Sequence, residues 1–212
     1  MTDVCFKKLI AMLAQNKRNV PSSYAFFRAA VLIPLVVNQG NLEMLFEVRS
    51  KELSWQPGEI CFPGGRIDAN DSTPVAAAVR ETVEELGVTQ NKIRVIGNID
   101  EIISPIGVML YPTVGLLEDT NFNLNQAEVA EVFTVPLSWL MKNQPLEAVM
   151  EMGTKPLEDF PFALLPDYPD EWRARTTYPV LFYKYDDYLI WGLTAYVLNK
   201  FVNMLDATDL VS

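Results

Sequence analysis

The segment from Phe62 to Val88 constrains the fold of this chain more than any other part of the sequence. It begins with the residues Phe-Pro-Gly-Gly at the end of a predicted strand, and it closes at Gly87. Between these glycines the sequence predicts a helix over Ser72–Leu86, because a serine or threonine can cap it, a proline suits its first turn and a glycine can end it. The segment is therefore expected to form a strand, a loop and a helix in direct succession.

Three glutamates share one side of this predicted helix. Spacings of three and four residues place Glu81, Glu84 and Glu85 on one face, which is expected to point outward. An opposite apolar stripe is expected to hold the helix on a sheet; it comprises Ala76, Val79, Val83 and Leu86. Like charges at these spacings destabilise an isolated helix, and the helix dipole disfavours anions near the C-terminus. The arrangement calls for a compensating cation, although a solvated acidic face is the alternative interpretation.

The paired glycines Gly64 and Gly65 support the interpretation that a cation binds at the acidic face. Glycine lets the backbone adopt unusual dihedral angles and approach a ligand closely. A backbone carbonyl from this turn and carboxylates from the following helix would form an all-oxygen site suited to Mg²⁺ or Mn²⁺. A simple tight turn remains the alternative for the glycines taken alone.

The composition excludes several other kinds of chemistry. The chain has no histidine, so serine–histidine and cysteine–histidine catalysis and histidine-ligated zinc are excluded. A formal net charge of −10 argues against a general binder of nucleic acid or anionic membranes. The two cysteines, Cys5 and Cys61, are too few for a disulfide framework. Together with a start that lacks the layout of a signal peptide, they favour a cytoplasmic protein.

Elsewhere the pattern predicts an α/β fold, an α+β sandwich in which a mixed β-sheet is flanked by helices. Strands are expected over Ala29–Val37, Glu43–Val48, Glu59–Phe62, Ile93–Ile103, Val108–Leu117 and Glu131–Val135. Helices are expected over Phe6–Gln15, Leu137–Lys142 and Leu189–Leu205, and a hairpin with irregular loops over Pro145–Pro179. We expect one domain over 1–212, with an N-terminal helix within about 1–20 and a C-terminal helical extension over about 137–212.

At the glycine-bounded helix the sequence resembles the Nudix hydrolase family. The similarity to the Nudix box rests on Gly65, Asp71, Arg80-Glu81, Glu84-Glu85 and Gly87-Val88. Asp71 stands where the general pattern has glutamate, and one extra residue separates it from Arg80. Both features are those of the coenzyme A pyrophosphatase branch, whose Phe-Pro-Gly-Gly is followed by a basic residue and two aspartates, here Arg66, Asp68 and Asp71.

The resemblance to this branch extends over roughly Ala29 to Phe201. The upstream motif of the branch is similar to Leu45–Ser50, Gly58 and Phe62, and its later segments resemble 128–137 and 190–195. Ser54 departs from the upstream motif, which has a second arginine at that position.

The resemblance implies roles for individual residues. Glu81, Glu84 and Glu85, with the Gly65 carbonyl, are expected to bind Mg²⁺ or Mn²⁺, and Arg80 is expected to orient the carboxylates. The general base stays open: Glu128 and Glu131 are the candidates outside the helix, Glu81 could serve as ligand or base, and Glu59 and Asp68 are weaker candidates. For the phosphates of the substrate we expect Arg49 and Arg66, with Lys51 as an addition, because a guanidinium suits phosphate oxygens.

The function implied is metal-dependent cleavage of coenzyme A or acyl-CoA to adenosine 3′,5′-bisphosphate and 4′-phosphopantetheine. The alternatives are an ADP-ribose, NADH or dinucleotide pyrophosphatase, and a non-catalytic Nudix-fold binding or regulatory module. The partner expected is a small-molecule nucleoside diphosphate, with no nucleic acid and no membrane. The sequence leaves open whether the protein forms a homodimer.

Overall fold

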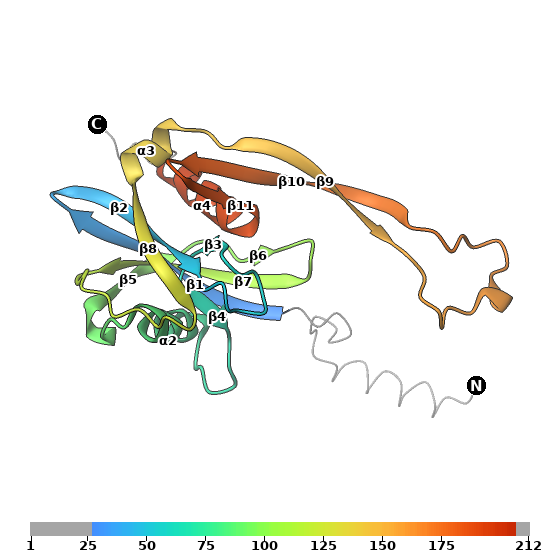
Figure 1. The fold of residues 1–212 in the computed structure, drawn as a ribbon, viewed down its shortest axis with the longest axis horizontal. Helices are drawn as coiled ribbons and strands as arrows, with labels where there is room; N and C mark the ends of the chain where they lie inside the picture. The colour runs from blue at the N-terminus through green and yellow to red at the C-terminus, as the bar shows by residue number, and fades with distance from the viewer. Residues whose placement is uncertain (1–26, 207–212) are drawn as a thin grey trace, which may run out of the picture.

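The computed structural model of this chain describes residues 27–206 (Figure 1). The helix expected over Phe6–Gln15, within the N-terminal stretch of about 1–20, lies outside the described residues. The described part forms an eight-stranded mixed sheet and a three-stranded antiparallel sheet. It is therefore the expected α+β architecture, a mixed sheet flanked by few helices.

The elements follow one another along the chain as named here. The larger sheet contains β1 (Phe27–Asn38), β2 (Asn41–Arg49), β3 (Ile60–Cys61), β4 (Gly64–Arg66), β5 (Ile93–Asn98), β6 (Ile102–Ile103), β7 (Val108–Leu117) and β8 (Val129–Pro136). The smaller sheet contains β9 (Leu146–Thr154), β10 (Arg173–Tyr185) and β11 (Tyr188–Trp191). The helices are α2 (Pro74–Leu86), α3 (Leu137–Lys142) and α4 (Gly192–Asp206). Two single 3₁₀ turns lie at Gln90–Lys92 and Phe162–Leu164.

Strand β1 runs through the middle of the larger sheet, parallel to β7 and antiparallel to β2. Because side chains alternate along a strand, its residues serve two cores on opposite faces. Ala30 and Leu32 pack with α2 on one face, whereas Ala29 and Ile33 pack with α4 on the other. Figure 1 shows α2 and α4 on the two sides of this sheet.

Helix α2 begins and ends where the sequence predicts. The Thr73 hydroxyl accepts a hydrogen bond from the Ala76 N–H at 3.1 Å, and Pro74 lies in the first turn. At the other end Gly87 has φ 68°, and its N–H donates to the Val83 carbonyl at 3.0 Å. A left-handed residue at this position favours glycine, which fixes the end of the helix.

The expected C-terminal helical extension is corrected by the structure. The described part of this stretch contains three strands besides helices α3 and α4. The hairpin expected within Pro145–Pro179 is present as β9 and β10. The helix expected from Leu189 begins instead at Gly192, because Leu189–Trp191 pair with β10 as strand β11. The sequence did not reveal this boundary, because the apolar residues of β11 continue directly into those of α4.

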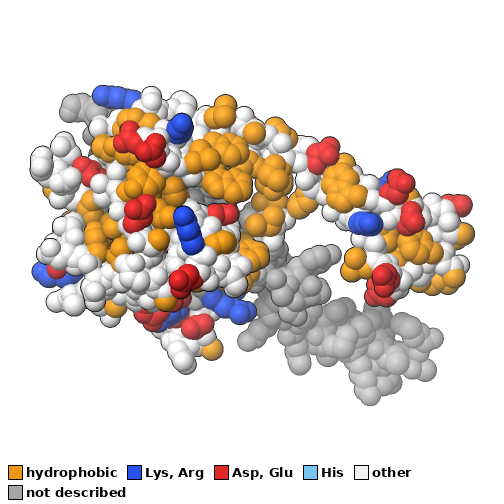
Figure 2. Space-filling model, in the orientation of Figure 1, with side chains coloured by type: hydrophobic (Ala, Val, Ile, Leu, Met, Phe, Trp, Pro, Cys, Tyr) orange, Lys and Arg blue, Asp and Glu red, His pale blue; other side chains and the backbone are white. Residues whose placement is uncertain are grey.

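The β9–β10 arm, defined here as 147–179, projects beyond the rest of the molecule in Figure 1. Figure 2 shows hydrophobic side chains along this arm as well as over the body. None of the helices within 27–206 is long and apolar enough to cross a membrane.

Candidate functional site

The three glutamates of α2 differ in burial. Glu85 is 3% exposed, the Glu81 side chain is 16% exposed and the Glu84 side chain is 53% exposed. The expectation that the whole acidic stripe faces outward is therefore wrong for Glu85. The physical reason is that α2 packs on the sheet through the small side chains of Ala77 and Ala78, both fully buried. The buried face of the helix therefore extends from the expected apolar residues Val79 and Leu86 round to Glu85.

The paired glycines allow α2 to lie against the turn that precedes it. The Gly64 N–H donates to Glu85 Oε2 at 2.8 Å. A Cβ on Gly64, whose φ is 153°, would collide with the backbone of Ala30 and Val31, and a Cβ on Gly65 would lie 2.6 Å from the Glu81 carboxyl carbon. Gly64 therefore excludes larger residues, whereas a larger residue at Gly65 would displace the Glu81 carboxylate. The contact shown is made by an N–H group, and the role of the Gly65 carbonyl as a ligand stays a prediction.

Arg80 ties the outer carboxylates together. It pairs with Asp71 through two bonds, Nε to Oδ1 at 3.1 Å and Nη2 to Oδ2 at 3.0 Å. Its Nη1 lies 2.9 Å from Glu81 Oε1 and 3.1 Å from Glu84 Oε2. The hydrogen bonds with Asp71 raise the pKa of Arg80 and lower the pKa of Asp71. These are the contacts needed to orient carboxylates, the role expected for Arg80.

Glu47 is a site residue that the sequence analysis missed. It is 1% exposed on β2, and its Oε1 accepts a hydrogen bond from the Cys61 S–H at 3.1 Å. Its Oε2 is buried and has no hydrogen-bond partner. Desolvation raises its pKa, and the charges of Glu128 and Glu81 act in the same direction. The available signal was a glutamate within the apolar strand Glu43–Val48.

The structure brings four carboxyl groups into electrostatic contact, and we call Glu47, Glu81, Glu85 and Glu128 the carboxylate cluster. Burial is the main cause that raises the pKa of Glu85, followed by the charge of Glu47. Burial also raises the pKa of Glu81, which Arg80 partly offsets. The charge of Glu128, from the loop before β8, raises the pKa of the other three.

The donor set fits a divalent cation. Buried carboxylates that repel one another and a buried oxygen without a partner are relieved by a hard cation, which prefers oxygen ligands. Within 27–206, no three acidic, cysteine or histidine side chains converge into a preassembled metal cage. Glu81 and Glu84 are held by Arg80, and Glu85 is held by the Gly64 N–H.

The basic residues expected at the substrate are not equally placed. Arg49, at the end of β2, is close enough for its charge to lower the pKa of Glu47, and its Nε is buried without a partner. Arg66 is exposed, with its guanidinium 5.5 Å from the centre of the Phe27 ring. Lys51 is exposed on the loop after β2. Of the three basic residues expected at the substrate, Arg49 is therefore the one whose charge acts on the carboxylate cluster.

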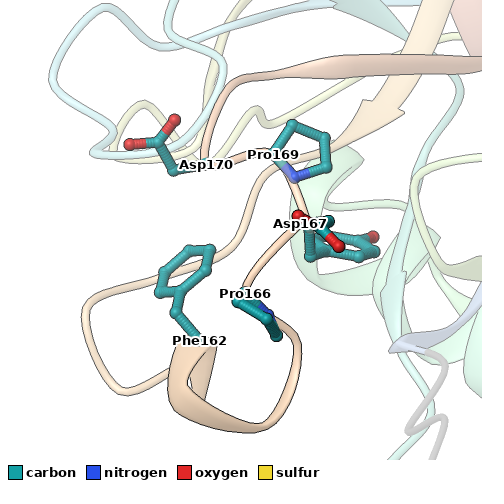
Figure 3. A pocket seen from close by; sticks show the side chains of 6 residues that line it. Phe162, Pro166, Asp167, Pro169 and Asp170 are labelled. Carbon is teal, nitrogen blue, oxygen red and sulfur yellow. The ribbon is translucent and has the colours of Figure 1, made fainter.

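Two hollows lie outside the carboxylate cluster. One, of about 410 Å³, lies at the tip of the arm and is lined by Phe162, Pro166, Asp167, Tyr168, Pro169 and Asp170 (Figure 3). It contains none of the expected site residues. The other, of about 520 Å³, lies between 57–60 and 187–191 and also includes Val48 and Glu131; we call it the β11 groove. Glu131, the alternative base, thus lies in the groove.

The family model described as the NUDIX domain matches residues 26–154, which include the glycine turn, α2 and Glu128. The chain belongs to the Nudix family. The sequence-based expectation of this family is confirmed.

Curated relatives of this Nudix protein include hydrolases. It is 39% identical over 134 residues to the mouse peroxisomal coenzyme A diphosphatase NUDT7, an alignment that covers 61% of this chain and 56% of the mouse protein. It is 32% identical over 173 residues to the Nudix hydrolase NudL of Photorhabdus laumondii, covering 81% of each chain. A solved MutT/nudix family protein from Enterococcus faecalis is 14% identical, with a TM-score of 0.49, covering 97% of this chain and 70% of that one.

With these relatives, the chain is a Nudix diphosphate hydrolase. Nudix hydrolases generally use divalent metal cations and act on small-molecule nucleotides. The non-catalytic alternative is therefore not needed to explain this chain.

Proposed function

We propose that this Nudix hydrolase cleaves the diphosphate linkage of coenzyme A or acyl-CoA, which gives adenosine 3′,5′-bisphosphate and 4′-phosphopantetheine. The observation that carries the proposal is the Asp71–Arg80 pair, held by two bonds between the glycine turn and α2. Asp71 is the residue by which the segment resembles the coenzyme A branch. The similarity to a coenzyme A diphosphatase over 134 residues supports the same substrate.

Mg²⁺ or Mn²⁺ is the proposed cofactor, with Glu81, Glu84, Glu85 and the Gly65 carbonyl as ligands. The chemistry that such an ion supplies is neutralisation of phosphate oxygens and a lower pKa for a bound water. Glu47 is a further acidic group beside Glu85, which it reaches electrostatically from β2. Its unpartnered Oε2 makes it a candidate to hold water or the ion in place.

The remaining steps are assigned to side chains of this chain. Arg80 holds Glu81 and Glu84 in position, and the Gly64 N–H holds Glu85. Glu128 is the proposed general base, because it faces the cluster and is only half-buried, so it can take a proton from water and release it. Arg49 is the proposed phosphate contact, since its Nε has no protein partner. Arg66 and Lys51, both exposed, are proposed as additional phosphate contacts.

ADP-ribose, NADH or a dinucleotide is the second candidate substrate. The observation in its favour is Ser54, an exposed serine where the coenzyme A motif has an arginine. A ribose 3′-phosphate would then be recognised by fewer basic residues.

The test is a substrate panel of coenzyme A, 3′-dephospho-coenzyme A, ADP-ribose, NADH and diadenosine polyphosphates, each with Mg²⁺ or Mn²⁺ and with products identified by mass. We expect coenzyme A to give the highest kcat/KM and the two named products. A higher kcat/KM for ADP-ribose, NADH or a dinucleotide would contradict the proposal. An unchanged kcat/KM without the 3′-phosphate would remove that group from the recognised features.

A further inference from the structure

The β11 groove has firm walls. Val48 forms its floor, paired with Ile60 on one side and with Glu131 on the other. Tyr188 stacks on Phe133 with ring centroids 3.6 Å apart and an interplanar angle of 1°, and its hydroxyl lies 3.5 Å from Glu131 Oε1. A stacked ring that is also tied at its polar end moves little, so this wall is preorganised for a ligand.

The chemistry of the groove differs from that of the carboxylate cluster. Leu189 and Trp191 line it and are 49% and 39% exposed, which offers apolar surface to a ligand. Its charged lining residues are all acidic, namely Glu59, Glu131 and Asp187. Such a surface repels phosphate, accepts hydrogen bonds from N–H groups and packs against alkyl groups. The groove therefore suits an uncharged, partly apolar chain.

Arg49 connects the groove with the cluster. Its carbonyl accepts a hydrogen bond from the Gly58 N–H at 3.1 Å, and its N–H donates to the Glu59 carbonyl at 2.9 Å. Gly58 and Glu59 line the groove, whereas the Arg49 charge acts on Glu47. By strand alternation, Val48 points to the opposite face of β2 from Glu47 and Arg49. The groove and the cluster thus lie on opposite faces of β2, so a molecule that occupies both must be long and flexible.

We propose that the β11 groove binds the uncharged half of the diphosphate substrate, a flexible chain with amide N–H donors and alkyl segments such as pantetheine. This inference rests on the proposed function, because it assumes a diphosphate bound at the cluster and at Arg49. A groove of about 520 Å³ has the size of a small-molecule site. The phosphates stay at Arg49, and the amides of the chain meet the acidic groups of the groove.

The test uses Leu189→Arg, which places a bulky cation in the groove at an exposed strand position. The matched control is Leu157→Arg, at a 75% exposed leucine in the arm. With coenzyme A as substrate we expect kcat/KM to fall at least about tenfold in Leu189→Arg, mainly through KM, and to stay within about twofold in Leu157→Arg. Circular dichroism of both variants checks folding, and Leu189→Ala provides a milder change with the same direction.

Inhibition by each of the two products tests separately where each half of the substrate binds. We expect 4′-phosphopantetheine to inhibit the wild-type enzyme and to lose at least about tenfold in potency against Leu189→Arg, while adenosine 3′,5′-bisphosphate inhibits both equally. Equal losses for both products, or none for either, overturn the groove assignment while the proposed function stands. If Leu189→Arg loses more kcat/KM with NADH than with coenzyme A, the groove binds a ring system. That outcome also overturns the groove assignment. A wild-type enzyme that leaves coenzyme A intact overturns both proposals.

Discussion

The carboxylate cluster and the β9–β10 arm use their side chains in opposite ways. In the cluster, acidic groups such as Glu47 and Glu85 are buried. In the arm, apolar groups such as Leu157 and Leu164 are more than 70% exposed. Burying a carboxylate costs stability unless something compensates its charge, whereas exposing a leucine forgoes only the gain from burial. Substitutions in the cluster should therefore change both activity and the response to metal, and substitutions in the arm should change neither.

The sharpest test of this contrast is Glu85→Gln. The amide keeps an acceptor for the Gly64 N–H but cannot ionise to bind a cation, so we expect the fold to persist. Mg²⁺-dependent hydrolysis should fall about a hundredfold or more. The exposed Glu118→Gln serves as the control. Activity of Glu85→Gln close to wild type, at matched metal concentration, would remove Glu85 from the site.

Gly65→Ala tests the close approach of the turn to α2. The new Cβ would lie 2.6 Å from the Glu81 carboxyl carbon, so Glu81 must move away from Arg80. Because the end of a flexible side chain can move, we expect a loss of less than about 1 kcal/mol in the free energy of unfolding but a lower kcat, since Glu81 is displaced. Gly97→Ala is the matched control, because a Cβ there meets nothing within 4 Å. A kcat of Gly65→Ala equal to that of Gly97→Ala would show that the turn is looser than the structure indicates.

The pH dependence of stability provides a third test. Burial raises the pKa of Glu47 from 4.5 to about 7, and it raises the pKa of Glu85 as well. A raised carboxyl pKa stabilises the folded state below the ordinary value, and that contribution is lost as pH rises through the folded value. Without metal, thermal stability should decline from about pH 5 upward, and added Mg²⁺ should raise the Tm more at high pH than at low pH.

Differential scanning fluorimetry with EDTA or with Mg²⁺ measures this trend across pH. In Glu85→Gln, Tm should depend less on pH both with EDTA and with Mg²⁺, because one of the two buried carboxyl groups is gone. A metal effect on Tm that is the same at all pH values would mean that the cluster does not titrate in this range.

The smallest effect is expected in the arm. Leu164 is 78% exposed, so Leu164→Ala should change the free energy of unfolding by less than about 0.5 kcal/mol. Leu140→Ala, at a fully buried leucine of α3, should cost about 2–5 kcal/mol. A large loss for Leu164→Ala would show that the arm is covered in solution.

The sequence predicted those features whose signals are local. The capping threonine, the proline in the first turn and the closing glycine defined α2, and the Nudix box lay within the same segment. Glu47 was missed because its role depends on the pairing of Glu47 with Cys61 across two strands, which no local pattern reveals. The burial of Glu85 was missed because the buried face of α2 is wider than the predicted apolar stripe. It includes Ala77, Ala78 and Glu85 as well as Val79 and Leu86.

The β11 groove was equally beyond local patterns. Its lining comes from β2, the 57–60 segment, β8 and β11, which meet only when both sheets are assembled. The strand β11 itself was hidden, because Leu189–Trp191 merge without a break into the apolar sequence of α4.

The hydrogen bond from Cys61 to Glu47 affects the chemical reactivity of the thiol. Burial and the charge of Glu47 raise the pKa of the Cys61 thiol well above its usual value. A thiol that keeps its proton is a poor nucleophile toward oxidants and alkylating agents, and a poor ligand for soft metals, which bind thiolates. The Cys61 sulfur therefore keeps its proton beside Glu47 and adds no thiolate to the oxygen donors of the carboxylate cluster.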